Sequence, residues 1–169
     1  MGYESDKMES DMGLLDGKVA IVTGAGGGLG RAHAMLLAQH GASVVVNDLG
    51  GSRDGTGSGN SMADTVVEEI RAAGGQAAAT YGSVTDDAAA AAMIQCAVDN
   101  FGRLDILINN AGILRDRSFK NMTDAEWDAV IDVHLRGSYL ATKHAWQQML
   151  AQGEGGRIIM TSSTSGLIG

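Results

Sequence analysis

The stretch Thr23-Gly24-Ala25-Gly26-Gly27-Gly28-Leu29-Gly30 decides how this chain folds. It follows an apolar run at 19–22 and precedes a helical pattern that begins at Arg31. A strand that ends in such a turn before a helix presents backbone N–H groups to an anion, because glycines place no Cβ atom in the way and the helix dipole adds partial positive charge. The junction therefore predicts a site for the pyrophosphate of a dinucleotide.

The spacing of the glycines narrows the kind of site. Gly24, Gly28 and Gly30 fit G-x-x-x-G-x-G, whereas no window of the chain fits the G-x-G-x-x-G fingerprint of other dinucleotide-binding folds. Taken alone, the stretch is equally compatible with a flexible loop that merely joins two elements. The choice depends on the rest of the chain.

Length and charge limit the classes of function. With 169 residues the chain is long enough for one domain with a substantial core. Its 12 Lys and Arg against 20 Asp and Glu give a net charge of -8, which disfavours a broad basic face for nucleic acid or an anionic membrane surface. The single cysteine, Cys96, excludes an internal disulfide and a cysteine-based zinc site. We expect Cys96 to be a core thiol and expect no metal site.

The N-terminal residues differ from the rest of the chain. Residues 1–13 are polar and acidic, without the apolar centre of a secretory signal, and predict a disordered tail. The folded domain is expected over 14–169. No run approaches the roughly 18 apolar residues of a membrane-spanning helix, so none is expected.

Apolar runs alternate with helical patterns along the remaining chain. Because this alternation is typical of repeated βαβ units, it predicts an α/β fold with a doubly wound, Rossmann-like parallel sheet covered on both faces. Asp86 and Thr123 are expected to be N-caps, Gly74 and Gly102 to end helices, and Gly137 to bend or interrupt the last helix. Strands are predicted at 19–23, 43–47, 76–81, 104–109 and 157–161, and helices at 31–40, 61–73, 86–101 and 123–152.

Asp48 closes the second predicted strand, where a doubly wound fold points a side chain at the adenosine ribose. A carboxylate there accepts both ribose hydroxyls and repels a 2′-phosphate, which favours NAD over NADP. Arg53 lies in the glycine- and serine-rich loop at 50–60 and could reach a phosphate, and a capping role is the structural alternative for Asp48. That loop is either a mobile loop beside the cofactor or a tolerated surface insertion.

The fourth predicted strand runs into Asn109-Asn110-Ala111-Gly112. Two amides at the carboxyl end of a strand, followed by small residues, suit a wall for a ribose or nicotinamide while the amides hold neighbouring strands together. An ordinary Asx turn is the structural alternative.

These motifs, followed by Ser162-Ser163-Thr164-Ser165-Gly166, resemble the short-chain dehydrogenase/reductase family in their order and separation. The resemblance covers about 14–169. It implies that Ser163 is the catalytic serine, which hydrogen-bonds the oxygen of the substrate. A hydrolase nucleophile is the competing interpretation of Ser163, but no G-x-S-x-G surrounds it. The cofactor-binding residues that the resemblance implies are Thr23, Gly24, Gly28, Leu29, Gly30, Asp48, Ser83, Val84, Asn110, Ala111 and Gly112, with Ser83 and Val84 framing the adenine.

Many members of the family place an asparagine in the long helix before the fifth strand, where this chain has His134. In the family the residue at this position supports a proton relay through the helix backbone and a bound water. The resemblance therefore implies a relay or an architectural role for His134. Helical spacing alone places His134 on a stripe with Trp127, Ile131 and Ala141 and predicts a hydrogen-bonded core residue.

Three segments are similar to the (3R)-hydroxyacyl-CoA dehydrogenase domain of peroxisomal multifunctional enzyme type 2 and its bacterial relatives: 45–51, 109–119 and 133–138. This similarity implies NAD-dependent oxidation of a 3-hydroxyacyl-CoA, a homodimer or homotetramer, and a peroxisomal location in a eukaryote or a cytoplasmic one in a bacterium. Alternatives are a 3-oxoacyl-carrier-protein reductase or other carbonyl reductase of the family, and a non-catalytic dinucleotide-binding module.

The family's catalytic Tyr-x-x-x-Lys pair is expected about thirteen residues beyond the serine, and the sequence ends at Gly169, six residues after Ser163. The chain is therefore expected to be an N-terminal fragment, inactive by itself. Tyr139 and Lys143 have the spacing of the pair but precede the serine, so their place in the order is wrong for it.

Overall fold

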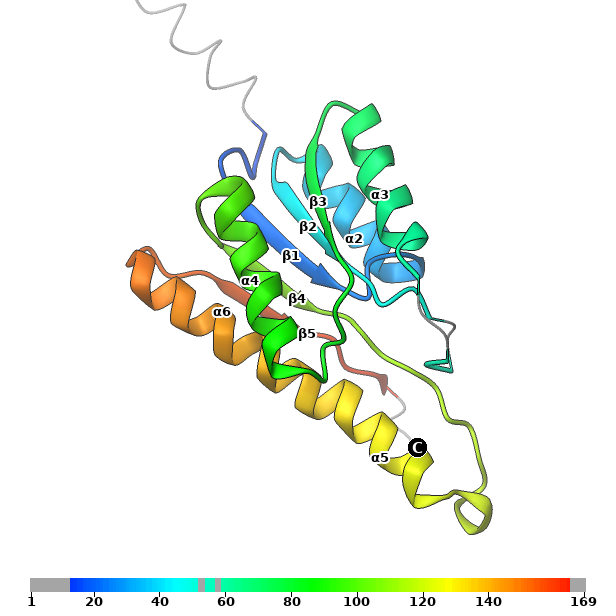
Figure 1. The fold of residues 1–169 in the computed structure, drawn as a ribbon. Helices are drawn as coiled ribbons and strands as arrows, with labels where there is room; N and C mark the ends of the chain where they lie inside the picture. Colours follow the sequence, from blue (N-terminus) through cyan, green and yellow to red (C-terminus); the bar gives the residue numbers. More distant parts are fainter. Residues whose placement is uncertain (1–12, 52–53, 57–58, 165–169) are drawn as a thin grey trace, which may run out of the picture.

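The computed structural model describes residues 13–51, 54–56 and 59–164, and within them it forms an α/β fold around one parallel sheet (Figure 1). The strand order, β3-β2-β1-β4-β5, places the first strand in the middle and winds the chain outward in both directions. All four pairings are parallel, so the doubly wound sheet predicted from the alternating pattern is confirmed. The strands are β1 (Val19–Thr23), β2 (Ser43–Asn47), β3 (Gln76–Thr80), β4 (Ile106–Asn109) and β5 (Arg157–Met160).

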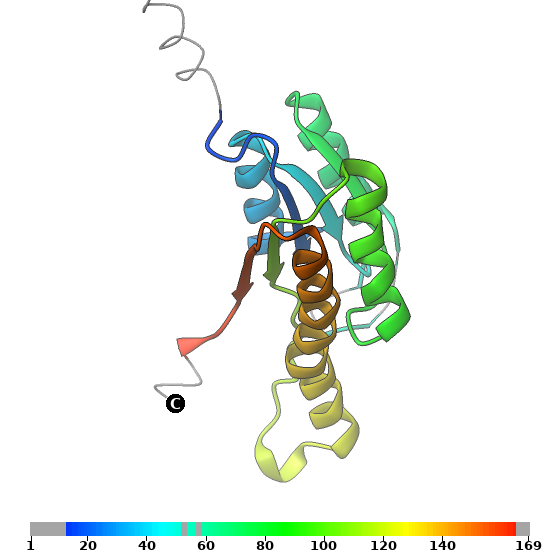
Figure 2. The same cartoon turned by 90° about the vertical axis from the view of Figure 1, so that its left-hand side faces the viewer.

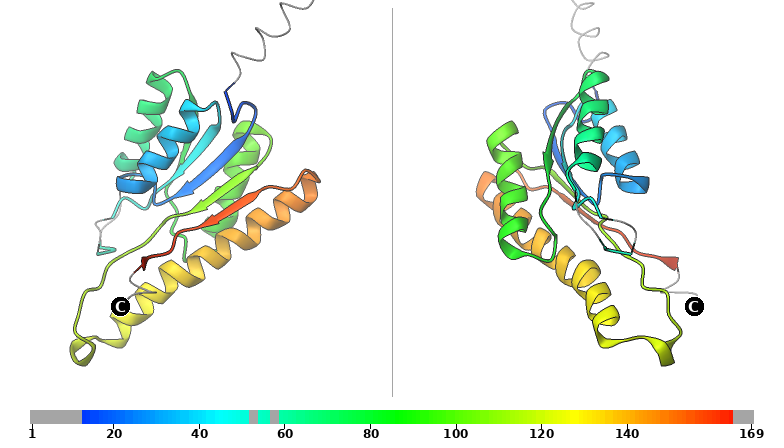
Figure 3. Two further views of the ribbon diagram at one scale, coloured as in Figure 1. Left: turned by 180° about the vertical axis from the view of Figure 1, so that it is seen from behind. Right: turned by 45° about the vertical axis from the view of Figure 1, so that its right-hand side comes forward.

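Helices cover both faces of the sheet (Figures 1 and 3). On one face α2 (Gly28–Gln39) and α3 (Ser61–Ala72) bury small and β-branched side chains against the strands. On the other face α4 (Asp87–Phe101) and α6 (Ser138–Gln152) form a second core layer. Cys96 of α4 was expected to be a core thiol; it is half-buried and packs against this layer from its margin, and burial raises the pKa of the thiol.

The fifth strand forms an edge of the sheet and is the least buried (Figure 2). Side chains alternate along it: Ile158 packs against the layer of α4 and α6, whereas Ile159 on the opposite face is 48% exposed. None of the helices among the described residues is long and apolar enough to cross a membrane.

The helix predicted at 123–152 is three consecutive pieces. It begins as α5 (Asp124–Ile131), continues as the π-helical η2 (Asp132–Gly137), and ends as α6. Of the predicted bend or interruption at Gly137, the structure shows a change from π-helix to α-helix there, with the backbone still in the right-handed helical region. A Cβ on Gly137 would lie 2.6 Å from Cγ2 of Val84, so the glycine allows a close approach. The short η1 (Phe119–Asn121) precedes this array.

The helix ends are capped largely as predicted. Asp86 accepts the N–H of Ala89, and Thr123 forms a capping box with Glu126. Backbone and side-chain hydrogen bonds from Thr123, together with Arg117, hold the pKa of Glu126 at about 2. Gly102 ends α4 in the left-handed region, with φ +81°.

One boundary differs in a way that matters for function. The helix predicted to begin at Arg31 begins at Gly28, so the last three residues of the glycine stretch form the first turn of α2. Glycine has a poor helix propensity, so the sequence pattern of these residues is that of a loop. Strand packing and helix contacts override that preference, and the N-terminus of α2 consequently lies directly at the end of β1.

A buried carboxylate joins the amino ends of β1 and β4. Asp105, 7% exposed, accepts the N–H of Val19 at 2.9 Å and two N–H groups of Arg103 at 2.6 and 2.8 Å. Burial alone raises the pKa of Asp105, but the guanidinium of Arg103 and the N–H of Val19 outweigh it, so the pKa lies below its ordinary value. Arg103 also pairs with the exposed Glu154.

At the carboxyl ends of the same strands, the hydroxyl of Thr23 fastens the segment after β4. Thr23 is 1% exposed, and its Oγ1 accepts the N–H groups of Asn110 and Ala111, each at 3.0 Å. The side-chain amide of Asn110 donates back to the carbonyls of Thr23 (2.9 Å) and Gly24 (3.1 Å). The prediction that the amides hold neighbouring strands together is confirmed; Asn109 extends the same pattern to Thr142 of α6 at 3.2 Å.

Asp105→Asn should lower the free energy of unfolding by about 2 kcal/mol at pH 7, because a buried charged acceptor is lost. Since the pKa of Asp105 is depressed in the folded state, its contribution is present above the ordinary carboxyl pKa and is lost as the pH falls through the folded value. Urea unfolding at pH 7 and pH 3 should therefore show a difference that shrinks in acid. Glu154→Gln, at the exposed partner of Arg103, is the control and should change little; a pH-independent difference would contradict the assignment.

Thr23→Val should destabilise the domain by on the order of 2 kcal/mol, because two buried N–H groups lose their shared acceptor while the side-chain volume hardly changes. Thr23→Ser retains the hydroxyl and should retain most of the stability. Urea unfolding of both variants measures the difference. A larger loss in Thr23→Ser than in Thr23→Val would show that the methyl group, not the hydroxyl, matters.

Candidate dinucleotide site

A cavity of about 450 Å³ opens at the carboxyl ends of β1, β2 and β4, where the glycine stretch lies. Six of the cofactor-binding residues predicted from the sequence line it: Gly24, Gly28, Leu29, Asp48, Asn110 and Gly112. Segments that are far apart in the chain thus meet at one edge of the sheet, as the topology of parallel strands requires. The other described residues that line it are Gly27, Leu49, Gly51, Gly55, Met62 and Ile113.

The glycines are required by space as much as by backbone conformation. Gly24 has φ +62°, and a Cβ on it would lie 2.8 Å from Cα of Ala111. A Cβ on Gly30 would run into the carbonyl oxygen of Gly24. Gly28 differs: its φ is +52° but nothing lies within 4 Å of its Cβ position, so its bare backbone faces open space in the cavity.

The first turn of α2 supplies the positive end of a helix dipole to this space. Gly27 is the N-cap, and no described side chain caps the helix there. The N–H of Ala25 is instead held by the carbonyl of Asn47 at 2.9 Å, which keeps the turn against β2. A helix N-terminus without a side-chain cap, next to a glycine without neighbours at its Cβ, fits a phosphate group in contact with the backbone.

Asp48 holds two pieces of backbone beside the cavity. Its Oδ2 accepts the N–H of Gly26 and its Oδ1 the N–H of Gly50, both at 2.7 Å. The bond to Gly50 is the capping role that was the structural alternative for Asp48. Because each carboxylate oxygen has a second lone pair, these bonds leave acceptor capacity on the side of Asp48 that lines the cavity.

The residues present fit a dinucleotide. The turn offers a cradle that side chains would fill, the helix offers backbone donors to the pyrophosphate, and Asp48 offers carboxylate oxygens to ribose hydroxyls. Asn110 and Gly112 form the wall predicted from the motif at 109–112.

Thr23, Gly30 and Ala111 are close to the cavity but do not line it. Thr23 and Gly30 lie behind the turn, where they fix its shape through the contacts described above. Ala111 packs against Gly24 from below. Their role in cofactor binding remains a prediction.

Ser83 and Val84 follow β3 and are outside the cavity lining. Val84 is buried against Gly137 of η2. The hydroxyl of Ser83 lies 2.9 Å from that of Thr85 and accepts its N–H at 3.2 Å. Their framing of an adenine remains a prediction from the resemblance.

His134 contacts the wall of the cavity from η2. Its Nε2 lies 3.0 Å from the carbonyl oxygen and 3.1 Å from the amide nitrogen of Ile113. A Cβ on Gly112 would lie 2.7 Å from Cε1 of His134, so the ring lies directly against Gly112. His134 is hydrogen-bonded as predicted, but the prediction that it is a core residue is wrong, because His134 is exposed to solvent.

The carbonyl of His134 is also engaged. It accepts the hydroxyl of Ser138 at 2.7 Å, one helical turn later. His134 therefore has well-defined architectural contacts, and its part in a proton relay remains a prediction.

Ser163 lies in an exposed segment beyond β5, at the same carboxyl edge of the sheet. Its catalytic role remains a prediction. Ser165 and Gly166 of the same motif lie outside the described residues, as do Arg53 and residues 1–12 of the predicted tail.

The loop at 50–60 approaches the cavity from β2. Gly51 and Gly55 line the cavity, and a Cβ on Gly55 would lie 3.0 Å from Cγ2 of Ile113. Asp54 pairs with Arg115 at 3.9 Å. The described part of the loop thus lies beside the predicted cofactor site, in agreement with the interpretation of a loop beside the cofactor. The mobility of the loop remains a prediction.

Three residues at the site were missed by sequence reasoning. Met62, in the first turn of α3, and Ile113 line the cavity, and nothing in their local sequence distinguishes them from core residues. Asn47 gave a signal that was not used: it is a polar residue at the end of the otherwise apolar strand β2, and it is only 3% exposed.

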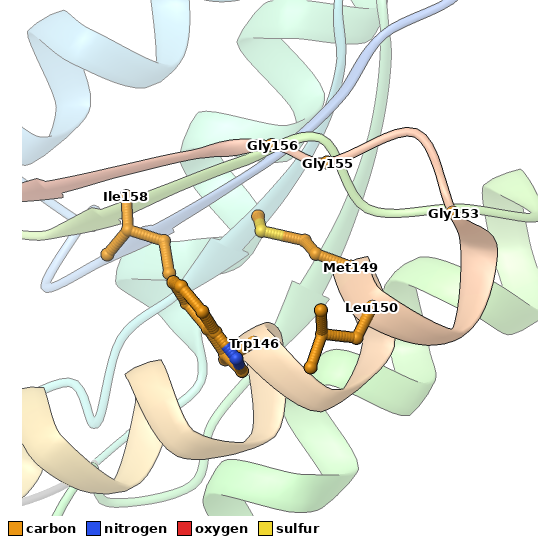
Figure 4. Close-up of a pocket in the computed structure, with 7 residues that line it drawn as sticks. All are labelled: Trp146, Met149, Leu150, Gly153, Gly155, Gly156 and Ile158. Atoms are coloured by element: carbon orange, nitrogen blue, oxygen red, sulfur yellow. The ribbon is translucent and has the colours of Figure 1, made fainter.

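A second cavity of about 450 Å³ lies between α6 and the amino end of β5 (Figure 4). Its lining is mostly apolar and includes none of the predicted site residues: Trp146, Met149, Leu150, Gly153, Gly155, Gly156 and Ile158. On the same helix, Lys143 pairs with Asp87 at 3.1 Å and Tyr139 is exposed. That Tyr139 and Lys143 are not the catalytic pair remains a prediction from their place in the sequence.

Comparison with known proteins identifies relatives of this chain. The chain is 55% identical over 154 residues to peroxisomal multifunctional enzyme type 2 of Mus musculus, covering 91% of this chain and 20% of that protein. It is 48% identical to a hydroxyacyl-CoA dehydrogenase of Mycobacterium tuberculosis, covering 92% of this chain and 50% of that protein. The chain therefore spans half or less of the length of these relatives.

A solved structure has the same fold. The crystal structure of a short chain dehydrogenase from Mycobacterium avium superposes with a TM-score of 0.82 at 52% identity, covering 91% of this chain and 55% of that one. The family profile of short chain dehydrogenase matches residues 18–169, which include the glycine turn, Asn110 and Ser163. The chain therefore belongs to the short-chain dehydrogenase/reductase family.

Proposed function

We propose that the chain binds NAD and that the protein containing it oxidises a (3R)-3-hydroxyacyl-CoA to the 3-ketoacyl-CoA. The observation that carries the choice of cofactor is the position of Asp48, whose carboxylate lines the cavity at the end of β2. A carboxylate accepts hydrogen bonds from ribose hydroxyls and repels a 2′-phosphate.

The chain's own residues would hold the cofactor in three places. The N–H groups at the start of α2 bind the pyrophosphate, Asp48 orients the adenosine ribose, and Asn110 with Gly112 supports the other half of the molecule. Bound NAD would supply the acceptor for the hydride that leaves the substrate carbon.

The substrate class is supported by the relatives' names and by the motif after β5. The mouse relative is a peroxisomal multifunctional enzyme and the mycobacterial one a hydroxyacyl-CoA dehydrogenase. In the proposed reaction Ser163 donates its hydroxyl hydrogen to the oxygen of the substrate and holds that oxygen in place. His134 holds Gly112 and Ile113 in position through the ring contacts described above.

Asp48→Arg should change the preference between cofactors. The ratio of the dissociation constants for NADP and NAD should fall by about tenfold or more, because repulsion of the 2′-phosphate becomes attraction. The ratio is the proper readout, since the substitution also removes the acceptor of Gly26 and Gly50 and weakens both cofactors. Calorimetric titration measures it. Asp48→Asn, which removes the charge and turns one of the two acceptor oxygens into an NH2 group, should give an intermediate ratio. Unchanged ratios in both variants would rule out ribose recognition by Asp48.

Ser163→Ala should lower kcat for a (3R)-3-hydroxyacyl-CoA by about 100-fold or more in the protein that contains this chain, with NAD affinity unchanged. Formation of NADH, followed by absorbance, gives kcat, and titration gives the NAD affinity. Ser162→Ala is the matched control and should retain activity. Undiminished turnover in Ser163→Ala would refute the assignment, and turnover of the (3S) substrate alone would refute the stereochemistry.

A further inference from the structure

Asn47 stands between two loops that meet the proposed cofactor from different directions. It is the last residue of β2, the strand flanked by β1 and β3, and its register partners are Thr23 and Thr80. It is only 3% exposed. A buried side-chain amide at the end of an apolar strand is costly unless its donors and acceptors are satisfied, so its contacts indicate why it is there.

The backbone and the side chain of Asn47 point to different loops. The backbone carbonyl accepts the N–H of Ala25 in the glycine turn at 2.9 Å. The side-chain Nδ2 donates to the carbonyl of Gly82 at 3.0 Å and to Oγ1 of Thr80 at 3.2 Å. One residue thus ties the turn after β1 to the loop after β3.

The loop after β3 is also held on the side of α4. The N–H of Asp86 bonds the carbonyl of Ser83 at 3.2 Å, and Asp86 in turn caps α4 through Ala89. A Cβ on Gly82 would lie 2.6 Å from Cβ of Ala89, so Gly82 is in close contact with the helix. The hydrogen bond from Asn47 fixes this loop on the side of the sheet.

The chemistry of the contacts requires an amide. Nδ2 carries two hydrogens and faces two acceptor oxygens, so each oxygen receives one hydrogen. A carboxylate in its place would present a buried negative charge to the same two oxygens, and a protonated carboxyl would restore only one donor.

We propose that Asn47 is a positioning residue, which holds the loop at 82–86 in register with the glycine turn and so sets the affinity for the adenosine half of the dinucleotide. The inference rests on the proposed NAD function, because Ser83 and Val84 frame the adenine only if a dinucleotide binds at this edge. Asn47 itself does not touch the cofactor, and its effect passes through the carbonyl of Gly82.

The experiment compares two ligands and two readouts. This chain is titrated calorimetrically with ADP and with inorganic pyrophosphate. In Asn47→Ala the dissociation constant for ADP should be about tenfold larger than in wild type, and that for pyrophosphate should stay within about twofold of wild type. A general structural defect would weaken both ligands alike. Tyr81→Phe is the matched control: it removes the hydrogen bond from Tyr81 to Asp64 beside the same loop and should leave ADP binding unchanged.

Asn47→Asp adds a pH profile. Burial and the two facing oxygens raise the pKa of the introduced carboxyl, so its ADP affinity should approach that of wild type as the pH falls from 8 to 5 and one donor returns. Asn47→Ser, which also retains one donor, replaces Asn47→Ala in the comparison if the latter does not fold. Amide hydrogen exchange without ligand should be about tenfold faster at 82–86 in Asn47→Ala and unchanged at 28–31.

The outcomes separate the two proposals. If wild type binds ADP and the Asn47 variants bind it equally well, the inference is overturned while the cofactor assignment stands. If wild type binds neither ligand, the cofactor assignment fails, and the exchange at 82–86 alone decides whether Asn47 holds the loop. Unchanged exchange there overturns the inference in either case.

Discussion

The hydrogen bonds between Thr23 and Asn110 are the constraint on which the cofactor cavity depends. They join the carboxyl ends of β1 and β4 in both directions, since the hydroxyl of one residue accepts backbone N–H groups and the amide of the other donates to backbone carbonyls. The carbonyls of Thr23 and Gly24 are thereby satisfied by the side-chain amide of Asn110. The turn that follows can keep its bare backbone towards the cavity without leaving buried acceptors unpaired.

In the proposed function this arrangement would hold an anion with backbone groups alone. Asp48 is the one charged residue among the described residues that line the cavity, and it is negative. A negative side chain would repel a phosphate, but the two charges lie in different parts of the cavity. The first turn of α2 offers partial positive charge at one end, whereas the carboxylate lies at the end of β2, where neutral hydroxyls rather than phosphates would come. The short glycine turn keeps these two regions in one cavity.

The outline of the fold and much of the site could be predicted, because strand ends, glycines and turn polarity are local features. Asp48 and the motif at 109–112 were placed correctly because parallel strands bring their carboxyl ends together. The start of α2 could not be predicted, since glycine's weak helix propensity conceals a helix that tertiary packing imposes. His134 was expected in the core because spacing identifies a helix face but not what covers it, and α5 with η2 extends beyond the strands (Figure 1). Asn47 was missed because the partners of a buried amide are known only once β3 lies beside β2.

The double attachment of Asp48 has a consequence for how cofactor choice can change over evolutionary time. The same carboxylate that faces the cavity also fixes Gly26 and Gly50, and a Cβ on Gly26 would lie 2.7 Å from its Cγ. If Asp48 selects the cofactor as proposed, a single exchange at this position would alter the selectivity and the shape of two loops together. A lineage moving towards the phosphorylated cofactor would then gain from compensating changes around positions 26 and 50, which would restore the two loops, whereas descendants that kept the acidic residue would inherit the geometry of both loops with it.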